Sequence, residues 1–495
     1  MKGPVLALLA AAAALWACGP HPSAARGSRG VLVLAVDALR ADHVSGLGYD
    51  RATTPALDRL AEEGATFLDA WSAAPEVLPA HAALLTGCDP GLAQRPGAAA
   101  PGPAADLARW RVPDGFPSLA QELLARGFET AAFVDHPDVA PIRGVAKGFQ
   151  TFAGYREDAV DPDLELGFEG VATRFVRWLA SRAADADWFA YLHVNDLERV
   201  WTRPPLDPRW DALYEPRPEL GSMPPVAEGD HAFFAIPRPR WAGVPKTLGE
   251  YELRYDGAIG QLDTKLARLL ERLRRLGRLD NTTVVVVGAF GVSFGEGGLY
   301  LDTGALTAAD LRVPLVVRPG AGVALPRGSR LDGLASLVDV APTVLELLGL
   351  RPPPSMSGVS HAPRLRDPAL PAARERAHAW GGFQRGVAAI DADWILARDR
   401  PAEAKSALLV RTYFGSGAPP DAGVVERLAR RGAQVAVDPG PGAADAARAR
   451  LGAALDDWTA WIDRARGVLH GRVTPAADPA TTAELRRRGL LSPAR

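Results

Sequence analysis

The stretch VLVLAVDALRADHVSGLGYDRATTPALDRLAEEGATFLDAWSAAP, residues 31–75, decides the fold class of this chain. It opens with VLVLAV at 31–36, a continuous apolar run with β-branched residues, which is typical of a strand buried on both faces of a parallel sheet. A helical pattern follows at 55–63. A buried strand that leads into a helix is the repeating unit of an α/β sheet covered on both faces.

The same alternation continues along the chain. Further apolar runs predict strands at 130–134, 188–194, 283–287 and 313–317. Helical patterns fall between these runs, at 118–126, 171–181 and 251–276. We therefore expect an α/β fold with a large, mostly parallel sheet sandwiched by helices. From about residue 377 the pattern changes to a few strands and a long helix at 444–464, which predicts a small C-terminal α+β subdomain.

Composition and charge exclude some classes of partner. The chain has 495 residues, of which 47% are hydrophobic, enough for a large core in one domain or two. The 56 basic and 58 acidic residues leave a formal net charge of −2. A chain with this balance has no electrostatic footprint for nucleic acid and no polybasic membrane patch. We expect no nucleic-acid partner.

The N-terminus has the features of an export signal. Lys2 supplies a positive charge, and the apolar run at 5–17 is shorter than the roughly 20 residues that span a bilayer. The run ends in LWACG, which resembles a bacterial lipobox except for its tryptophan. We expect residues 1–18 to be a lipoprotein signal peptide and 19–29 a tether, with lipid on Cys18 anchoring the protein to the bacterial cell envelope. A plain secretory signal is the alternative.

Three later blocks share a recognisable order with the opening stretch. They are LPAHAALLTG at 78–87, NTTVVVVGAFGVSFGEGG at 281–298 and LRVPLVVRPG at 311–320. In this order the blocks closely resemble the sulfatase branch of the alkaline-phosphatase superfamily, over about residues 30–350. The resemblance implies a sulfatase-like α/β domain over 30–370 and a C-terminal subdomain over 371–495. A segment at 203–244, dense in proline and aromatic residues, reads as an insertion that packs over the mouth of the site.

The resemblance also implies where the reacting groups should lie. Asp37 follows the first strand, where the family places its first metal carboxylate, and Ala38 stands where a second Asp is frequent. Val77 aligns with the nucleophile, yet valine has no lone pair and no ionisable proton. His81 aligns with a family Arg or His; it could touch an anion, or it could be a capping or solvated histidine on its helix.

Four more aligned positions have lost their usual groups. Ala289 and Phe290 replace the Asp and His of the second metal set, and Phe290 is expected to fill the space of the cation. Glu198 stands where relatives carry a His, and Asp302 stands where the family has a substrate-facing His or Lys. If both acids were ionised and close to a sulfate or phosphate, they would repel it; each could instead be a solvated loop acid.

Three functions remain open from the sequence. The first is a catalytically silent, sulfatase-like envelope lipoprotein that binds a sulfated or phosphorylated glycan or a protein partner. The second is a hydrolase of sulfate or phosphate esters with a rebuilt metal site, and the third is a purely structural envelope protein. We expect no cofactor in the first case, and a divalent cation, Ca²⁺ or Mg²⁺, only in the second. Its ligands would come from Asp37, His81, Asp135, His136, His193, Asp196, Glu198, Glu296 and Asp302.

Overall fold

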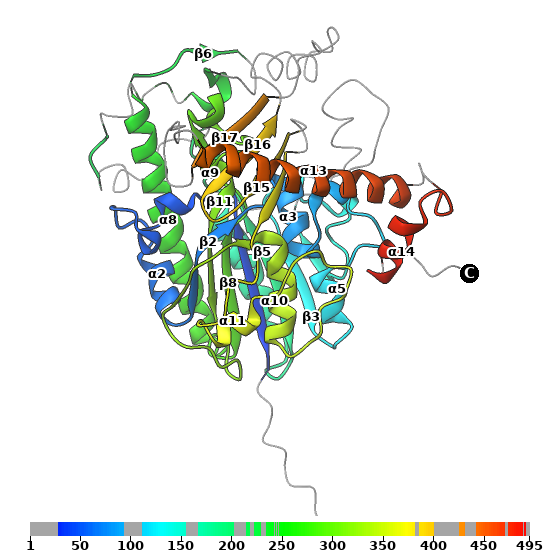
Figure 1. Cartoon of the computed structure of the whole chain (residues 1–495). Coiled ribbons are helices and arrows are strands. Elements are labelled where there is room, and N and C mark those ends of the chain that lie inside the picture. The colour runs from blue at the N-terminus through cyan, green and yellow to red at the C-terminus, as the bar shows by residue number, and fades with distance from the viewer. Residues whose placement is uncertain are drawn as a thin grey trace, which may run out of the picture.

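The structure is a computed structural model, and Figure 1 shows a large central sheet between helices with a smaller sheet beside one of its ends. It describes residues 28–93, 111–154, 167–201, 214–217, 222–228, 234–241, 243, 245, 247–381, 386–399, 425–430, 442–470, 474–488 and 490–491. The predicted signal peptide, nearly all of the tether and much of the 203–244 segment lie outside these residues.

The large sheet has nine strands, in the order β12-β2-β11-β8-β1-β5-β3-β4 with β13 paired to β2. Only β11 runs antiparallel to its neighbours, so the expectation of a mostly parallel sheet is confirmed. The strands are β1 (Gly30–Val36), β2 (Ala65–Trp71), β3 (Glu129–Phe133), β4 (Thr151–Ala153), β5 (Trp188–Val194), β8 (Thr282–Gly288), β11 (Arg312–Arg318), β12 (Ser329–Leu331) and β13 (Ala335–Ser336).

The apolar runs of the sequence became the middle of this sheet. Every residue of β1, β5 and β8 is buried, because helices cover both faces. The register places Val36 between Val194 and Gly288. The three strands therefore end side by side, and the residues that follow them meet at one edge.

Two groups of helices cover the sheet. The helices of the large domain are α2 (Pro55–Glu62), α3 (Val77–Thr86), α5 (Leu119–Leu124), α6 (Phe168–Ala180), α8 (Leu248–Arg275), α9 (Ala308–Leu311), α10 (Val340–Leu347) and α11 (Ala362–Arg366). α8 packs against α2 and α6, whereas α3 packs against α5 and α10 (Figure 1). α8 begins three residues before the predicted start because the Thr247 side chain accepts the Glu250 N–H, a helix N-cap.

The C-terminal region is a four-stranded antiparallel sheet under a long helix. Its elements are β14 (Ala377–Gly381), β15 (Gly386–Ile390), β16 (Trp394–Asp399), β17 (Val425–Arg430), α13 (Ala443–Leu469) and α14 (Pro479–Arg487). Successive side chains point to opposite faces of the sheet. Ile390, Ile395 and Ala397 pack against the large domain, whereas Ala389 and Leu396 pack against α13.

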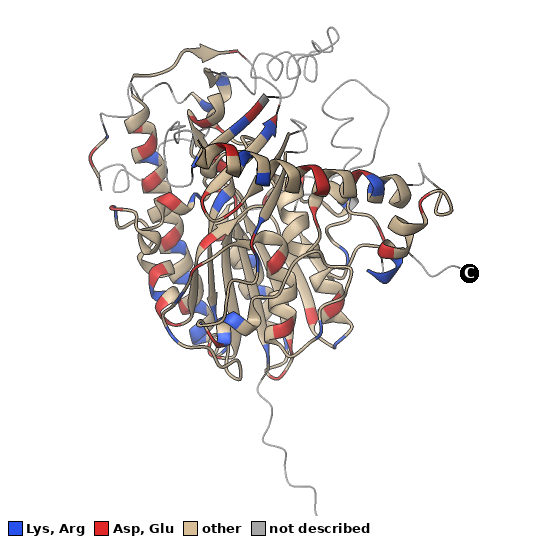
Figure 2. Cartoon of the chain, in the orientation of Figure 1, with Lys and Arg blue, Asp and Glu red and all other residues tan. Residues whose placement is uncertain are grey.

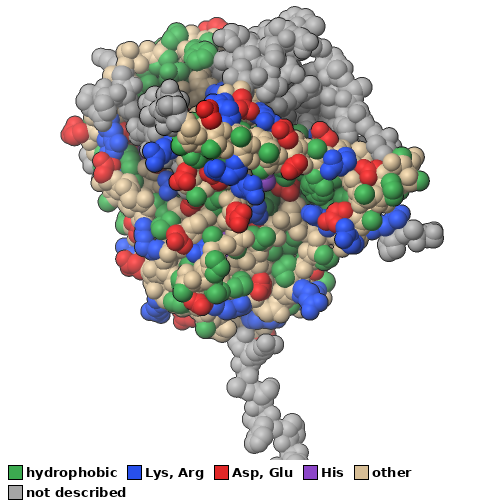
Figure 3. Space-filling model, viewed as in Figure 1, with side chains coloured by type: hydrophobic (Ala, Val, Ile, Leu, Met, Phe, Trp, Pro, Cys, Tyr) green, Lys and Arg blue, Asp and Glu red, His purple; other side chains and the backbone are tan. Residues whose placement is uncertain are grey.

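Charge is spread evenly over the helices. Figure 2 shows acidic and basic residues interspersed along α8 and α13, and Figure 3 shows both signs mixed with apolar side chains on the same face. Among the described residues, no helix combines the length and apolar character that crossing a membrane requires.

Short strands frame the carboxyl end of the large sheet. β9 (Ser293–Phe294) and β10 (Tyr300–Asp302) form an antiparallel pair, with the 3-10 helix η8 (Glu296–Gly298) between them. β6 (Val226–Ala227) and β7 (Ile236–Pro237) pair within the described part of the 203–244 segment, and β7 contacts β10. This part of the segment thus lies against the loop that follows β8.

Candidate functional site

The candidate site lies where β1, β5 and β8 end. Asp37 directly follows β1, and its N–H donates to the Val194 carbonyl at 3.0 Å. The Ala289 N–H donates to the Val36 carbonyl at 2.8 Å, which ties the end of β8 to the same point. In open α/β sheets, ligands bind at the carboxyl ends of the strands.

Two histidines hold the Asp37 carboxylate. His81 Nε2 lies 2.7 Å from Asp37 Oδ1, and His193 Nε2 lies 2.7 Å from Asp37 Oδ2. Tyr191 Oη bonds His81 Nδ1 on the far side of that ring. The relative exposure of Asp37, His81 and His193 is 0%, and that of Tyr191 is 1%. We call these four residues the buried Asp–His cluster.

Strand register and helix placement bring the cluster together. Tyr191 and His193 are two residues apart on β5, so their side chains share one face of the sheet. His193 pairs with Ala35 on β1, and Asp37 is two residues further along that same face. His81 reaches the carboxylate from α3, one helical turn after Val77.

The hydrogen bonds assign the protons of the cluster. An ionised carboxylate only accepts hydrogen bonds, so both Nε2 atoms carry a hydrogen. The Nδ1 of His193 accepts, because the Asp135 N–H donates to it at 3.4 Å, whereas the Tyr191 hydroxyl can either donate to His81 Nδ1 or accept from it. His193 is neutral in this arrangement, and the single negative charge of Asp37 is held by two N–H donors.

The pKa shifts agree with these protonation states. Burial would raise the pKa of Asp37, but His193 and His81 outweigh burial and hold it well below its usual value. Burial and the neighbouring His81 together lower the pKa of His193 to about 4, against the opposing effect of Asp37. At neutral pH the carboxylate is therefore charged and His193 is neutral.

The hydrogen bond at His193 Nδ1 disfavours a divalent metal ion at this cluster. One side-chain atom each from Asp37, His81 and His193 could reach a common point, since these atoms lie within 4.8 Å of one another. A histidine that binds metal through Nε2 carries its hydrogen on Nδ1 and donates it to an acceptor. The Nδ1 of His193 instead faces the Asp135 N–H, which is itself a donor. Ca²⁺ or Mg²⁺ would in addition need several oxygen ligands.

The aligned reactive positions hold apolar side chains. Val77 is the first residue of α3, is half-buried and packs against the main core. Phe290 and Ala289 are fully buried and belong to that same core. The Ser72 hydroxyl donates to the Ala289 carbonyl at 2.6 Å, which fixes the backbone at the end of β8. Phe290 thus packs in the apolar core beyond β8.

A strained turn carries Asp37 into the cluster. Ala38 has φ 56°, the left-handed region that non-glycine residues rarely adopt. Tyr255 on α8 holds this turn, because its hydroxyl donates to the Ala38 carbonyl at 2.6 Å and accepts the Arg40 N–H at 3.0 Å. Such strain persists only where the surrounding structure enforces it, and it clusters at functional sites.

The alternative of a solvated loop acid is wrong for Asp302. Asp302 is 1% exposed and pairs with Arg240, whose Nη2 lies 2.9 Å from Oδ1. Arg240 also donates to the Leu301 carbonyl at 2.7 Å. Glu198 begins the 3-10 helix η5 (Glu198–Trp201), is half-buried, and its pKa is raised by burial and by Asp37 and Asp302. Both acids are thus desolvated near the cluster, Asp302 neutralised by Arg240 and Glu198 pushed towards its neutral form.

His81 likewise matches neither sequence alternative. It is fully buried, so it is neither a solvated histidine nor placed to touch an anion from solvent. Its two ring nitrogens are occupied by Asp37 and Tyr191. The histidine therefore supports the buried carboxylate.

The remaining candidate ligands make hydrogen bonds, ion pairs or ring contacts elsewhere. Asp135 accepts the Gly167 N–H and Asp196 accepts the Phe168 N–H, so both bind the N-terminus of α6. Asp196 also pairs with Lys265 at 2.6 Å. Glu296 pairs with Arg40 at 3.0 Å, and His136 lies beside the cluster with its ring 6.4 Å from that of His193. Of the nine possible ligands, only three converge.

Two residues of the site were missed in the sequence. Tyr191 lies within a predicted strand and carries no functional signal of its own, although its spacing from His193 places both side chains on one face of that strand. Arg240 belongs to the 203–244 segment, and nothing in its local pattern marks it as the partner of Asp302.

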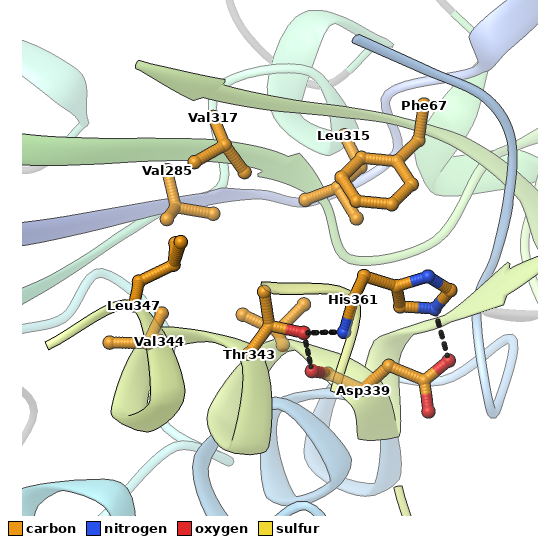
Figure 4. A pocket seen from close by; sticks show the side chains of 10 residues that line it. Phe67, Val285, Leu315, Val317, Asp339, Thr343, Val344, Leu347 and His361 are labelled. Atoms are coloured by element: carbon orange, nitrogen blue, oxygen red, sulfur yellow. Dashed lines mark hydrogen bonds and ion pairs between the residues drawn. The ribbon is translucent and has the colours of Figure 1, made fainter. Parts of the chain in front are cut away.

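A separate cavity lies between the sheet and α10, away from the cluster. Figure 4 shows Phe67, Val285, Leu315 and Val317 on one side and Val344 and Leu347 on the other. His361 sits at its rim, where Nε2 bonds Asp339 at 3.2 Å. The cavity volume is about 10 Å³, which is room for one water molecule rather than a substrate.

Comparison with known proteins agrees with this architecture. Residues 29–350 match the family model described as Sulfatase. A sulfatase of Formosa agariphila is 24% identical over 369 residues, which are 65% of this chain and 69% of that protein. An arylsulfatase of Clostridium perfringens is 23% identical over 386 residues, 67% of this chain and 77% of that protein.

One further relative and two solved structures bear on the ligand and the fold. An N-acetylglucosamine-6-O-sulfatase of Bacteroides thetaiotaomicron is 28% identical over 176 residues, 35% of this chain and 29% of that protein. The phosphonate monoester hydrolase of Agrobacterium radiobacter superposes with TM-score 0.62 at 18% identity, over 89% of this chain and 96% of the other. A protein solved with its substrate D-glucosamine-2-N,6-O-disulfate has TM-score 0.61 at 17% identity, over 89% and 99%.

Proposed function

The chain belongs to the sulfatase family of sulfate-ester hydrolases, and we propose that this member binds an anionic saccharide without hydrolysing it. The buried Asp–His cluster carries the proposal. Hydrolysis of a sulfate ester needs a nucleophile and a group that holds the oxyanion as charge develops. The one carboxylate at the expected place is sealed from solvent and bonded to two histidines.

The missing nucleophile supports the same conclusion. Val77 begins α3 at the aligned position, and an isopropyl group can neither attack a sulfur centre nor bind a cation. Phe290 and Ala289 supply no ligand from the end of β8. Restoring activity would therefore require changes in at least two separate elements.

The saccharide is suggested by what the relatives act on. One is described as an N-acetylglucosamine-6-O-sulfatase, and one solved structure holds a disulfated glucosamine. We propose a sulfated or phosphorylated glycan as the ligand of this chain; a protein carrying such groups is the alternative partner.

The test pairs hydrolysis with metal content. The purified protein is assayed on an aryl sulfate, a phosphate monoester and a phosphate diester, with Ca²⁺, Mg²⁺, Mn²⁺ or Zn²⁺, and its bound metal is measured by mass spectrometry. We expect substoichiometric metal and no turnover above that of Asp37→Ala. Turnover that disappears in Asp37→Ala would overturn the proposal.

A hydrolase with a rebuilt site is the second candidate. It is favoured by the convergence of Asp37, His81 and His193, which a metal could exploit if the hydrogen of His193 moved from Nε2 to Nδ1 and found an acceptor there. This candidate predicts one metal ion per chain, lost in His193→Phe together with turnover. Metal that is bound without turnover would leave the silent function in place and correct only the expectation of no cofactor.

We further propose that the protein is exported and held at a membrane of the bacterial envelope by lipid on Cys18. The support is the LWACG sequence, which lies outside the described residues. Metabolic labelling with an alkyne fatty acid should mark the wild-type chain and not Cys18→Ser, which should also leave the membrane fraction. Labelling of neither chain would indicate a plain secretory signal.

A further inference from the structure

A short segment of the 203–244 region is anchored against the site by both of its ends. This segment, Phe234–Trp241, is called the strap below. At its start the Phe234 N–H donates to the Gly298 carbonyl at 2.7 Å. Towards its end, Arg240 bonds the Leu301 carbonyl and the Asp302 carboxylate. Between these points β7 pairs with β6, so the backbone is held along its length.

Backbone strain gathers where the strap meets the site. Within the described part of the chain, three non-glycine residues have positive φ: Ala38 at 56°, Leu301 at 55° and Phe234 at 57°. Ala38 follows Asp37, Leu301 binds Arg240 of the strap, and Phe234 begins the strap. Backbone strain of this kind concentrates at active sites and ligand clamps.

Two aromatic rings of the strap face solvent. Phe234 is 59% exposed and Trp241 is 37% exposed, and no other aromatic residue of the described chain is so exposed. An apolar ring in water and a strained backbone are both unfavourable, and Phe234 combines the two. Stability alone does not explain this conformation.

Each ring is supported from behind. A Cβ on Gly298 would lie 2.9 Å from Phe234 Cε1, so the ring rests on a glycine that leaves it room. The Arg238 guanidinium lies 4.8 Å from the centre of the Trp241 ring, a cation–π contact. Rings held in this way lose little entropy when a flat partner stacks on them.

Charge at the strap favours an anion. Arg240 neutralises Asp302, and burial raises the pKa of Glu198, so the two acids near the cluster contribute little negative charge. The Arg238 side chain is 52% exposed, and its acidic neighbour Glu228 is 3.9 Å away and 86% exposed. A sulfate or carboxylate could therefore reach Arg238 with little desolvation.

We propose that the strap is a saccharide-binding surface, where Phe234 and Trp241 stack on sugar rings and Arg238 pairs with an anionic substituent. The proposal rests on the proposed function, since it names where the anionic saccharide binds. It concerns the rim of the site, and the buried Asp–His cluster takes no part in binding.

The experiment uses dextran sulfate, with unsulfated dextran and polyacrylate as matched probes. Binding to the full mature chain is measured by biolayer interferometry at 0.15 M salt. We expect dextran sulfate to bind at least tenfold more tightly than either control, because dextran lacks the anionic groups and polyacrylate lacks sugar rings.

Variants locate the binding. Phe234→Asn keeps a residue that tolerates left-handed backbone and removes the ring, so the strap should stay folded. We expect roughly tenfold weaker binding of dextran sulfate for Phe234→Asn, Trp241→Ala and Arg238→Gln, with unchanged thermal midpoints. Controls at the far end of α8, about 40 Å along the helix, are Leu276→Ala and Arg275→Gln, which remove an exposed apolar group and an exposed charge.

The outcomes separate this inference from the proposed function. If strap variants bind like the wild type while the wild type binds dextran sulfate, the surface is elsewhere and the inference fails alone. The inference is also overturned if the wild type binds none of the three probes, or if it binds polyacrylate as tightly as dextran sulfate. The wild type could also hydrolyse an aryl sulfate while the strap variants bind dextran sulfate more weakly. That result would refute the proposed function without hydrolysis, but it would support the inference about the strap.

Discussion

Replacing Asp37 tests the proton arrangement of the buried cluster most directly. In Asp37→Leu the Nε2–H groups of His81 and His193 both lose their acceptor in a site sealed from water. One unsatisfied buried donor costs about 1–3 kcal/mol. The free energy of unfolding should therefore fall by about 2–6 kcal/mol.

Asp37→Asn should be much milder. The amide oxygen can accept from His193, and its NH₂ group can donate to His81 if that ring moves its hydrogen to Nδ1. The Tyr191 oxygen can then accept that hydrogen. Two charge-assisted hydrogen bonds become neutral ones, at a cost of about 1–2 kcal/mol.

The assay is urea unfolding followed by tryptophan fluorescence, with and without EDTA. The expected order of midpoints is wild type, then Asp37→Asn, then Asp37→Leu, and EDTA should change none of them. Two results would refute the reasoning. One is an Asp37→Leu variant as stable as the wild type; the other is a wild-type midpoint that falls with EDTA, which would mean that a metal ion holds the carboxylate.

Of three further predictions, two concern single contacts and the third concerns a triple substitution. Tyr191→Phe removes the hydrogen-bond partner of His81 Nδ1 and should lower the free energy of unfolding by about 1 kcal/mol in the same assay; a neutral effect would show that this contact is not formed in solution. The pKa of Asp339 is lowered to about 2, because Arg374 and His361 outweigh burial. The ionised Asp339 carboxylate contributes its full stabilisation above its unfolded-state pKa near 4, and this contribution is lost as pH falls towards 2. In Asp339→Asn, the decrease in the free energy of unfolding between pH 4 and pH 2 should therefore be smaller by about 2 kcal/mol. The same decrease in the variant as in the wild type would contradict the ion pair. The third variant restores the inherited groups together, with Val77→Cys, Ala289→Asp and Phe290→His. It should recover Ca²⁺ or Mn²⁺ binding in calorimetry more readily than turnover, because the surrounding contacts have also changed. Turnover without measurable metal binding would contradict this prediction.

Much of the fold was predictable from local pattern. The five apolar runs all became strands of the large sheet, because uninterrupted apolar segments must be buried on both faces. β2 was not predicted, since its sequence ATFLDAW mixes polar with apolar residues and resembles no simple period. The antiparallel direction of β11 was also not predictable, because direction depends on the path of the chain between strands.

The site was predictable only in part, for a related reason. Asp37 and Val77 follow from position within short matching blocks, because each lies at the junction of a strand or a helix with its loop. The pairing of Asp37 with His81 and His193 joins residues 44 and 156 positions apart. No local pattern encodes such distances, which arise from strand register and from the placement of α3.

By itself, the amino-acid sequence determined the layered α/β architecture and the chemistry that is missing. An apolar run is removed from water only by burial, and a valine side chain is chemically inert wherever it lies in the fold. Only the tertiary structure decided what replaced that chemistry: which donors surround the one remaining carboxylate, and which nitrogen of each imidazole carries the hydrogen. Hydrogen-bond polarity belongs to pairs of groups in space, so it exists only once distant segments have packed together.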